Sequence, residues 1–153
     1  MKIQWKRLIL CIAIPLAVGG ISALLTSSGM ETFQALSKPP LSPPGWLFPV
    51  VWTLLYILMG IASYLVLTSG KPSRSALTFY GLQLLFNFFW SIIFFNLERY
   101  LFAFVWLIAL WILIFITTVL FYKISKPAGY LMIPYLLWVA FAGYLNLFIY
   151  LLN

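Results

Sequence analysis

The stretch KPPLSPPGWLFPVVWTLLYILMG, residues 38–60, joins a cluster of prolines directly to a long apolar segment. Four prolines lie within six positions, and Trp46, Pro49, Trp52 and Tyr56 follow them. Each proline fixes φ, which stiffens the chain and lowers the entropy lost when the chain becomes ordered. The stretch therefore predicts a rigid approach to a helix whose first turns carry large aromatic rings.

The composition of the whole chain is that of a membrane protein. Of its 153 residues, 65% are hydrophobic and only 7% are charged, whereas a soluble domain has about 25% charged residues. So few polar side chains cannot cover a surface that faces water. We therefore expect most of the surface to face lipid.

Five apolar runs are long enough to cross a bilayer, which takes about 20 helical residues. They cover residues 8–26, 46–68, 77–96, 100–122 and 128–152. Their polarity does not alternate as in barrel strands, so each must satisfy its backbone hydrogen bonds as a helix. We predict an all-α membrane protein, a single domain (1–153) built as a five-transmembrane-helix bundle with a long proline-rich loop at 27–45. The first run could instead be a signal peptide, although it is longer than a signal h-region and lacks a clear cleavage site.

The basic residues indicate the orientation. Seven of the nine lie on the N-terminal side of the membrane: Lys2, Lys6, Arg7, Lys71, Arg74, Lys123 and Lys126. The positive-inside rule then places the N-terminus in the cytoplasm and the C-terminus outside. Anionic lipid accounts for the net charge of +7, so no nucleic-acid partner is expected.

The residues that are missing exclude several kinds of chemistry. There is no histidine, so Ser-His-Asp and Cys-His systems are excluded. Two carboxylates and one thiol, Cys11, cannot assemble a catalytic metal site. No run has a charged residue at its centre, which argues against proton-coupled transport. We expect no metal and no resident cofactor, and the remaining chemistry is that of neutral amides and aromatic rings.

Polar and aromatic side chains share one face on each of three runs, at i, i+3/i+4 spacing. These faces carry Tyr80, Gln83, Asn87, Trp90 and Phe94 in the third run, Pro49, Trp52 and Tyr56 in the second, and Trp138, Ala142, Leu145 and Asn146 in the fifth. Ordinary hydrogen bonding between helices explains Gln83 and Asn146 taken singly. Trp52 and Trp138 lie deeper than the interfacial belt where tryptophan is usually found. Together with Asn87, they predict an aromatic pocket in which the amide could orient a ligand.

Two further segments have alternative interpretations. A loop as long as 27–45 is usually functional or disordered, so we expect a lid over the pocket, with a simple tether as the alternative. The small residues Gly19, Ala23 and Ser27 recur at a spacing that permits close helix contact. That contact could be made within the monomer or across a dimer.

Four motifs carry a resemblance to a known family. They are Lys38-Pro39 with Pro43-Pro44-x-Trp46, Trp52-x3-Tyr56-x2-Met59-Gly60, Asn87-x2-Trp90-x3-Phe94-Phe95, and Pro134-Tyr135-Leu136-x-Trp138. With these motifs in this order, the chain resembles the translocator protein family, also called tryptophan-rich sensory proteins or peripheral benzodiazepine receptors. The resemblance extends from about Pro15 to the end of the chain.

The resemblance implies a five-helix bundle, commonly a homodimer, whose pocket is covered by the loop that joins the first two helices. It implies that porphyrins such as protoporphyrin IX, sterols, isoquinoline carboxamides and benzodiazepines are ligands. The pocket residues it implies are Trp52, Tyr56, Asn87, Trp90, Phe94, Trp138, Ala142 and Leu145, and the lid residues are Lys38, Pro39, Pro43 and Pro44. Because some bacterial members break down protoporphyrin in light and oxygen, Trp52 and Trp138 are candidate catalytic residues.

The chain departs from the family pattern in two places. The sequence LNLFIYLLN at the C-terminus contains no cation, so sterol recognition through the C-terminal motif of some members is not expected. Leu41 stands where many members have an aromatic residue. We expect a protein of the bacterial cytoplasmic membrane. A porphyrin-degrading enzyme, a non-enzymatic carrier or stress sensor, and a structural membrane subunit remain alternatives.

Overall fold

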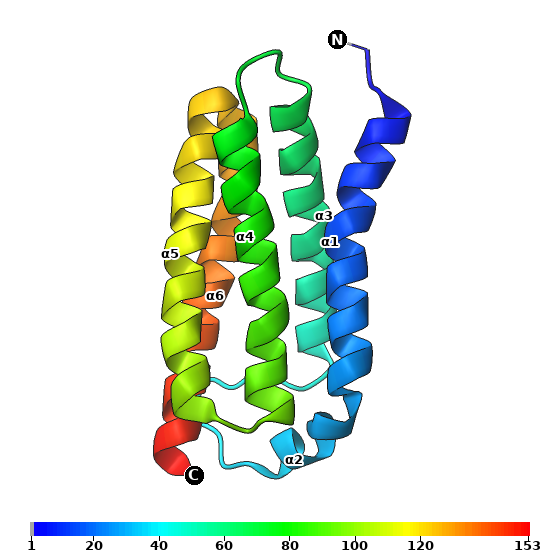
Figure 1. Cartoon of the computed structure of the whole chain (residues 1–153). Helices are drawn as coiled ribbons and strands as arrows, with labels where there is room; N and C mark the ends of the chain where they lie inside the picture. The colour runs from blue at the N-terminus through cyan, green and yellow to red at the C-terminus, as the bar shows by residue number, and fades with distance from the viewer. Residues whose placement is uncertain (1) are drawn as a thin grey trace.

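The computed structural model describes residues 2–153, and this range is helical with no strand (Figure 1). Five helices are long and apolar enough to cross a membrane. They are α1 (Trp5–Thr26), α3 (Leu47–Leu67), α4 (Arg74–Ser91), α5 (Tyr100–Ile124) and α6 (Lys126–Leu152). A π-helical turn, η2 (Ile92–Asn96), continues α4. The prediction of an all-α chain with five helices that are long and apolar enough to span a membrane is confirmed for the described residues.

The observed helices extend beyond several of the predicted runs. α1 begins at Trp5 rather than residue 8, α4 at Arg74 rather than residue 77, and α5 ends at Ile124 rather than residue 122. Hydropathy marks only the part of a helix that lies in hydrocarbon, whereas the backbone hydrogen bonds continue into the charged ends. The polar ends of these helices are therefore the parts that the apolar runs did not include.

The connection between α1 and α3 differs from the predicted loop at 27–45. Its first half is helical: a 3₁₀ turn, η1 (Ser27–Gly29), leads into the short helix α2 (Met30–Ala35). Residues 36–46 then run without helix and contain the four clustered prolines. Within this segment Leu41 has a φ of 70°. The irregular segment is thus about half as long as the sequence indicated.

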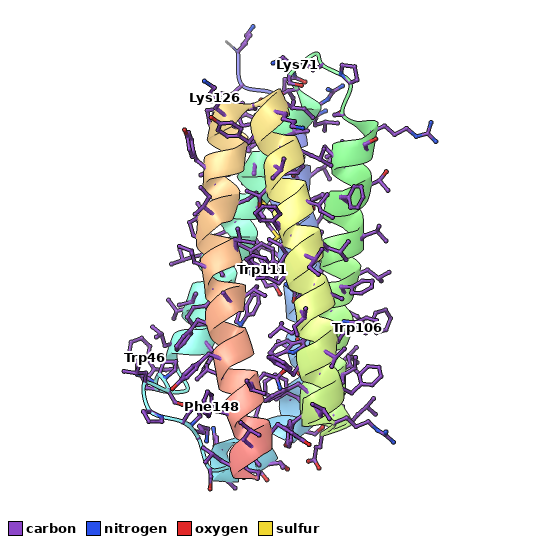
Figure 2. All side chains as sticks on the ribbon, turned by 90° about the vertical axis from the view of Figure 1, so that its left-hand side faces the viewer. Trp46, Lys71, Trp106, Trp111, Lys126 and Phe148 are labelled. Atoms are coloured by element: carbon purple, nitrogen blue, oxygen red, sulfur yellow. The ribbon has the colours of Figure 1, made fainter. Side chains whose placement is uncertain are left out.

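Two of the basic residues that the sequence analysis assigned to the same side of the membrane lie at the same end of the bundle. Figure 2 shows Lys71 and Lys126 at one end of the bundle, with Trp46 and Phe148 at the other. The Lys71 ammonium donates to the carbonyl of Ile124, 3.0 Å away, and so ties the α3–α4 turn to the end of α5. We call this end the N-terminal end, and the end that carries α2 the lid end.

Close helix contacts hold the half of the bundle nearer the N-terminal end together. A Cβ added at Gly60 of α3 would lie 2.6 Å from the Cα of Ile12 and 2.7 Å from the carbonyl oxygen of Cys11. Only glycine therefore permits this approach of α1 to α3. Around it, Met59, Ala62 and Ile114 are completely buried. α1 is otherwise peripheral and has the smallest buried share of the five spans.

Candidate functional site

A cavity of about 440 Å³ lies in the lid half of the bundle, between α1, α3, α4–η2 and α6. Seven of the eight predicted pocket residues line it: Trp52, Tyr56, Trp90, Phe94, Trp138, Ala142 and Leu145. They come from three helices that are distant in sequence, as the shared faces indicated. The cavity size is within the 300–1,000 Å³ range of small-molecule sites.

Two perpendicular indoles form the centre of the cavity wall. The ring centroids of Trp52 on α3 and Trp138 on α6 are 6.5 Å apart, with an interplanar angle of 86°. Trp52 also stacks on Tyr56 at 5.7 Å, which fixes its plane. The indole nitrogen of Trp138 is buried and finds no hydrogen-bond partner among residues 2–153. Since a buried polar group without a partner is costly, this N–H is an unsatisfied donor within the wall, covered by neighbouring atoms in the described structure.

The π-helical turn η2 forms the cavity end of α4. Phe94 and Phe95 of this turn both line the cavity. Such turns occur frequently at functional sites. Trp90, one turn earlier, contacts the Phe94 ring at a centroid distance of 5.3 Å.

Phe33 on α2 covers the lid end of the cavity, and the sequence analysis missed this residue. Its ring lies 6.1 Å from that of Phe48, 5.9 Å from Phe94 and 5.4 Å from Phe95. Phe33 is the only aromatic residue between 27 and 45. That single ring in a segment with no other aromatic side chain was the signal that could have identified it.

The predicted lid residues Lys38, Pro39, Pro43 and Pro44 do not line the cavity. Lys38 instead lies over the outer side of Phe33, with its ammonium 4.8 Å from the ring centroid. The same ammonium donates to the carbonyls of Gln34 and Leu36. Lys38 therefore holds the end of α2 in place, one layer outside the cavity.

The proline-rich segment is anchored to the end of α6. The amide of Asn153 donates to the Ser37 carbonyl at 2.8 Å, and the Ser37 backbone N–H donates to Asn153 Oδ1 at 3.1 Å. The Tyr144 hydroxyl donates to the carbonyl of Pro40 at 2.7 Å. These bonds hold the segment against the bundle in the described structure.

Asn87 does not line the cavity, unlike the other predicted pocket residues. Its side chain is 2% exposed, and both of its polar atoms are occupied. The Tyr56 hydroxyl donates to Asn87 Oδ1 at 3.3 Å, and Asn87 Nδ2 donates to the Tyr135 hydroxyl at 2.8 Å. Tyr135 in turn donates to Gln83 Oε1 at 2.6 Å. We call this set (Tyr56, Gln83, Asn87 and Tyr135) the buried network.

The buried network lies directly behind the cavity wall. Tyr56 is the member that belongs to both, and Tyr135 makes an edge contact with the Trp52 ring at 6.2 Å. Asn87 therefore bears on the cavity through Tyr56 and Tyr135, as a positioning residue. Gln83 acts within the network as the interhelical hydrogen bonder that its position in the apolar run indicated.

Asn146 has both of the roles that the sequence analysis considered, a hydrogen bond between helices and a place in the cavity wall. It accepts a hydrogen bond from the Trp90 indole N–H at 3.1 Å and donates to the Tyr100 carbonyl at 2.8 Å. It also lines the cavity. The indole nitrogen of Trp90 is therefore occupied, in contrast to that of Trp138.

The cavity wall is nearly all apolar, and none of the described residues that line it is charged. The polar groups are a few hydroxyls and the Asn146 amide, and the Thr26 hydroxyl already donates to the Ser22 carbonyl. Within residues 2–153 no group of His, Cys, Asp or Glu side chains could hold a metal ion. The arrangement suits a flat, mostly apolar molecule with few hydrogen-bonding atoms.

Comparison with known proteins agrees with the motifs quoted above. Residues 11–152 match the model of the TspO/MBR family. The tryptophan-rich protein TspO of Chlorobaculum tepidum is 41% identical over 157 residues, which cover 100% of this chain and 99% of the relative. The tryptophan-rich protein TspO of Archaeoglobus fulgidus is 43% identical, with 96% and 97% covered. The translocator protein of Bos taurus is 35% identical, with 87% and 82% covered.

Proposed function

Because the chain belongs to the TspO/MBR family, we propose that it binds porphyrins such as protoporphyrin IX, and hydrophobic drug-like molecules, in the aromatic cavity. The observation that carries the proposal is the convergence of Trp52, Trp90 and Trp138 on one uncharged cavity beneath α2. Stacked or edge-on aromatic contacts each add about 0.5–1.5 kcal/mol beyond the burial of area.

The geometry supports a particular mode of binding. Since the Trp52 and Trp138 planes are almost perpendicular, a flat macrocycle can stack on one indole while its edge meets the other. A small rotation of the Trp138 ring would present its unpartnered N–H to an oxygen or nitrogen acceptor on the ligand. The buried network keeps Tyr56, and through it Trp52, in a fixed orientation.

The proposal includes the setting of the protein. We place the chain in the cytoplasmic membrane of a bacterium, with the N-terminus inside and the C-terminus outside. The concentration of basic residues at the N-terminal end supports this orientation. We also expect a homodimer surrounded by membrane lipid, with α2 and the proline-rich segment acting as the lid.

A second candidate function is light-dependent breakdown of the bound porphyrin. The edge contact between Trp52 and Trp138 favours it, because two indoles beside a photoexcited ring are good one-electron donors. Light absorbed by the porphyrin and molecular oxygen supply the reactivity. In this cycle an indole gives one electron to the excited ring, the ring passes that electron to oxygen, and a second electron from the ring restores the indole. The oxidised ring and the reduced oxygen then combine, so that one carbon–carbon bond of the ring breaks and two carbon–oxygen double bonds form. The protein supplies position and electrostatics, as proteins do for reactive bound groups.

The test is a spectral titration of the purified protein with protoporphyrin IX. In the dark, saturable quenching of tryptophan fluorescence is expected, whereas a structural membrane subunit gives none. Under light and oxygen, an enzyme replaces the porphyrin Soret band with a product band, whereas a carrier or sensor leaves it intact.

The matched variants are Trp138→Phe and Trp5→Phe, since Trp5 is 63% exposed and does not line the cavity. At a porphyrin concentration that saturates each variant in the dark, loss of the product band in Trp138→Phe alone supports a direct role for the indole. Product that forms undiminished in Trp138→Phe rules that role out.

A further inference from the structure

The cavity is closed at its lid end by several independent contacts. Phe33 meets three aromatic rings there, and the Asn153 and Tyr144 side chains hold the segment outside it. On the α1–α4 side, the Asn96 amide donates to the Leu25 carbonyl at 2.9 Å. A molecule that entered through the lid would have to break these contacts together.

One side of the cavity is not closed in this way. Five of the residues that line it are exposed, and all five belong to the facing surfaces of α1–η1 and α3. They are Gly20, Ala23, Ser27, Pro49 and Thr53. The residues that line the cavity from α4, η2 and α6 are buried or half-buried. The cavity therefore opens sideways between α1 and α3; we call this the lateral opening.

The size of the side chains explains why the space between α1 and α3 stays unfilled here. Nearer the N-terminal end, Gly60 lets the two backbones touch, and Gly19 packs directly against the Tyr56 ring. One residue further, a Cβ added at Gly20 would meet no described atom within 4 Å. With glycine, alanine and serine on the α1 side, no large side chain fills the gap.

The lateral opening lies at the depth of lipid chains. Gly20 is six residues before the end of α1 at Thr26, and Thr53 is six residues after the start of α3 at Leu47. At 1.5 Å per residue both lie about 9 Å below the lid end, within a hydrocarbon half-thickness of about 15 Å. Leu24 and Leu54 beside the opening are 77% and 56% exposed. The part of the opening between Gly20 and Thr53 therefore faces acyl chains, while Ala23 and Pro49, three and two residues from the same helix ends, lie closer to the lid end.

We propose that ligands enter and leave the cavity sideways from the membrane through this lateral opening, with Gly20, Ala23, Pro49 and Thr53 as its rim. This inference rests on the proposed porphyrin binding. The ligand class is an apolar, flat molecule that first dissolves in the leaflet on the lid side. The lid keeps water out of the cavity and does not open for each ligand.

The test measures the rates at which protoporphyrin IX binds and leaves the protein in lipid vesicles, by stopped-flow quenching of tryptophan fluorescence. Gly20→Phe places a ring in the lateral opening. Its matched control is Gly81→Phe on α4, an exposed glycine that also has open space around it and does not line the cavity. A third variant, Asn153→Ala, loosens the lid.

If the lateral opening is the route, Gly20→Phe slows both association and dissociation by about tenfold, a barrier raised by roughly 1.4 kcal/mol. The equilibrium dissociation constant changes little, because the same barrier is crossed in both directions. Gly81→Phe and Asn153→Ala keep the wild-type rates. Equal rates in Gly20→Phe and Gly81→Phe, with faster rates in Asn153→Ala, would overturn the proposal in favour of entry through the lid.

Different results would refute the proposed porphyrin binding and the proposed lateral entry. If wild type shows no saturable quenching, the proposed function fails, whatever the variants do. If wild type binds and Gly20→Phe alone does not bind at equilibrium, the site itself has been damaged. In that case Thr53→Phe, on the α3 side of the lateral opening, is the deciding variant. Slower porphyrin association and dissociation in Thr53→Phe support entry through the lateral opening, and unchanged rates refute it.

Discussion

The two halves of the bundle are built from the same helices but filled in different ways. Nearer the N-terminal end, α1 and α3 touch at Gly60, and Met59, Ala62 and Ile114 are completely buried. In the lid half, the helices surround a cavity of about 440 Å³. The tightly packed half nearer the N-terminal end therefore fixes the helix positions, and the aromatic residues of the lid half project from these fixed helices.

The buried network lies at the boundary between these halves. Its hydroxyl and amide groups satisfy one another across α3, α4 and α6. The buried network restricts the orientation of its side chains more than apolar packing would, because each hydrogen-bond donor needs a particular acceptor. Polar residues thus stabilise the packed side, while the cavity side keeps the Trp138 N–H unpaired.

The largest effect is expected where the packed half depends on a glycine. Gly60→Leu forces α1 away from α3, because even the Cβ would overlap the Ile12 and Cys11 backbone. We expect a loss of about 3 kcal/mol in the free energy of unfolding, the upper end for overpacking. Gly20→Leu, in open space, is the control and should cost far less. Reversible unfolding in detergent measures both, and equal losses would mean that the two halves do not differ in packing.

Next in size is the loss of the buried network. Asn87→Leu leaves the Tyr56 hydroxyl without its acceptor and removes the donor to the Tyr135 hydroxyl, which still donates to Gln83, and we expect a cost of about 2 kcal/mol of unfolding free energy. Porphyrin affinity should fall as a consequence, because Tyr56 no longer holds Trp52. Tyr56→Phe should then lower affinity in the same direction. An Asn87→Leu variant with full stability but no binding would instead indicate direct contact between Asn87 and the ligand.

A smaller effect separates two tryptophans that look equivalent in sequence. Trp90→Phe breaks the hydrogen bond to Asn146 and should cost about 1 kcal/mol of stability. Trp138→Phe breaks no such bond within the described chain, so it should lower ligand affinity while leaving stability nearly unchanged. Thermal unfolding and porphyrin titration of both variants check the difference. Identical stability losses would contradict the unpaired state of the Trp138 N–H.

The smallest effect is expected at the lid. Asn153→Ala removes exposed hydrogen bonds to Ser37, worth about 0.5 kcal/mol. Faster hydrogen exchange at the Ser37 amide should result, with global stability retained. Exchange at that amide that is unaffected by the substitution would show that other contacts hold the lid.

The sequence predicted the membrane class from composition and the five spans from the positions of its long apolar runs. It also predicted that Trp52, Trp90 and Trp138 lie near one another, since helical spacing places each of them on the polar and aromatic face of its own helix. It could not distinguish Asn87 from its neighbours, because one face contributes both to the cavity wall and to the network behind it. It gave no sign of η2, where the Phe95 backbone lies so close to Gly29 that a Cβ at Gly29 would overlap it.

Filling the cavity is the most direct test of the claim that this aromatic hollow is the binding site. Ala142→Phe puts a ring into the cavity from α6, whereas Ala140→Phe puts the same ring on the exposed face of that helix. Porphyrin titration in the dark should show saturable quenching in wild type and Ala140→Phe, and none in a folded Ala142→Phe protein. Binding by folded Ala142→Phe that is as tight as in wild type would contradict the account.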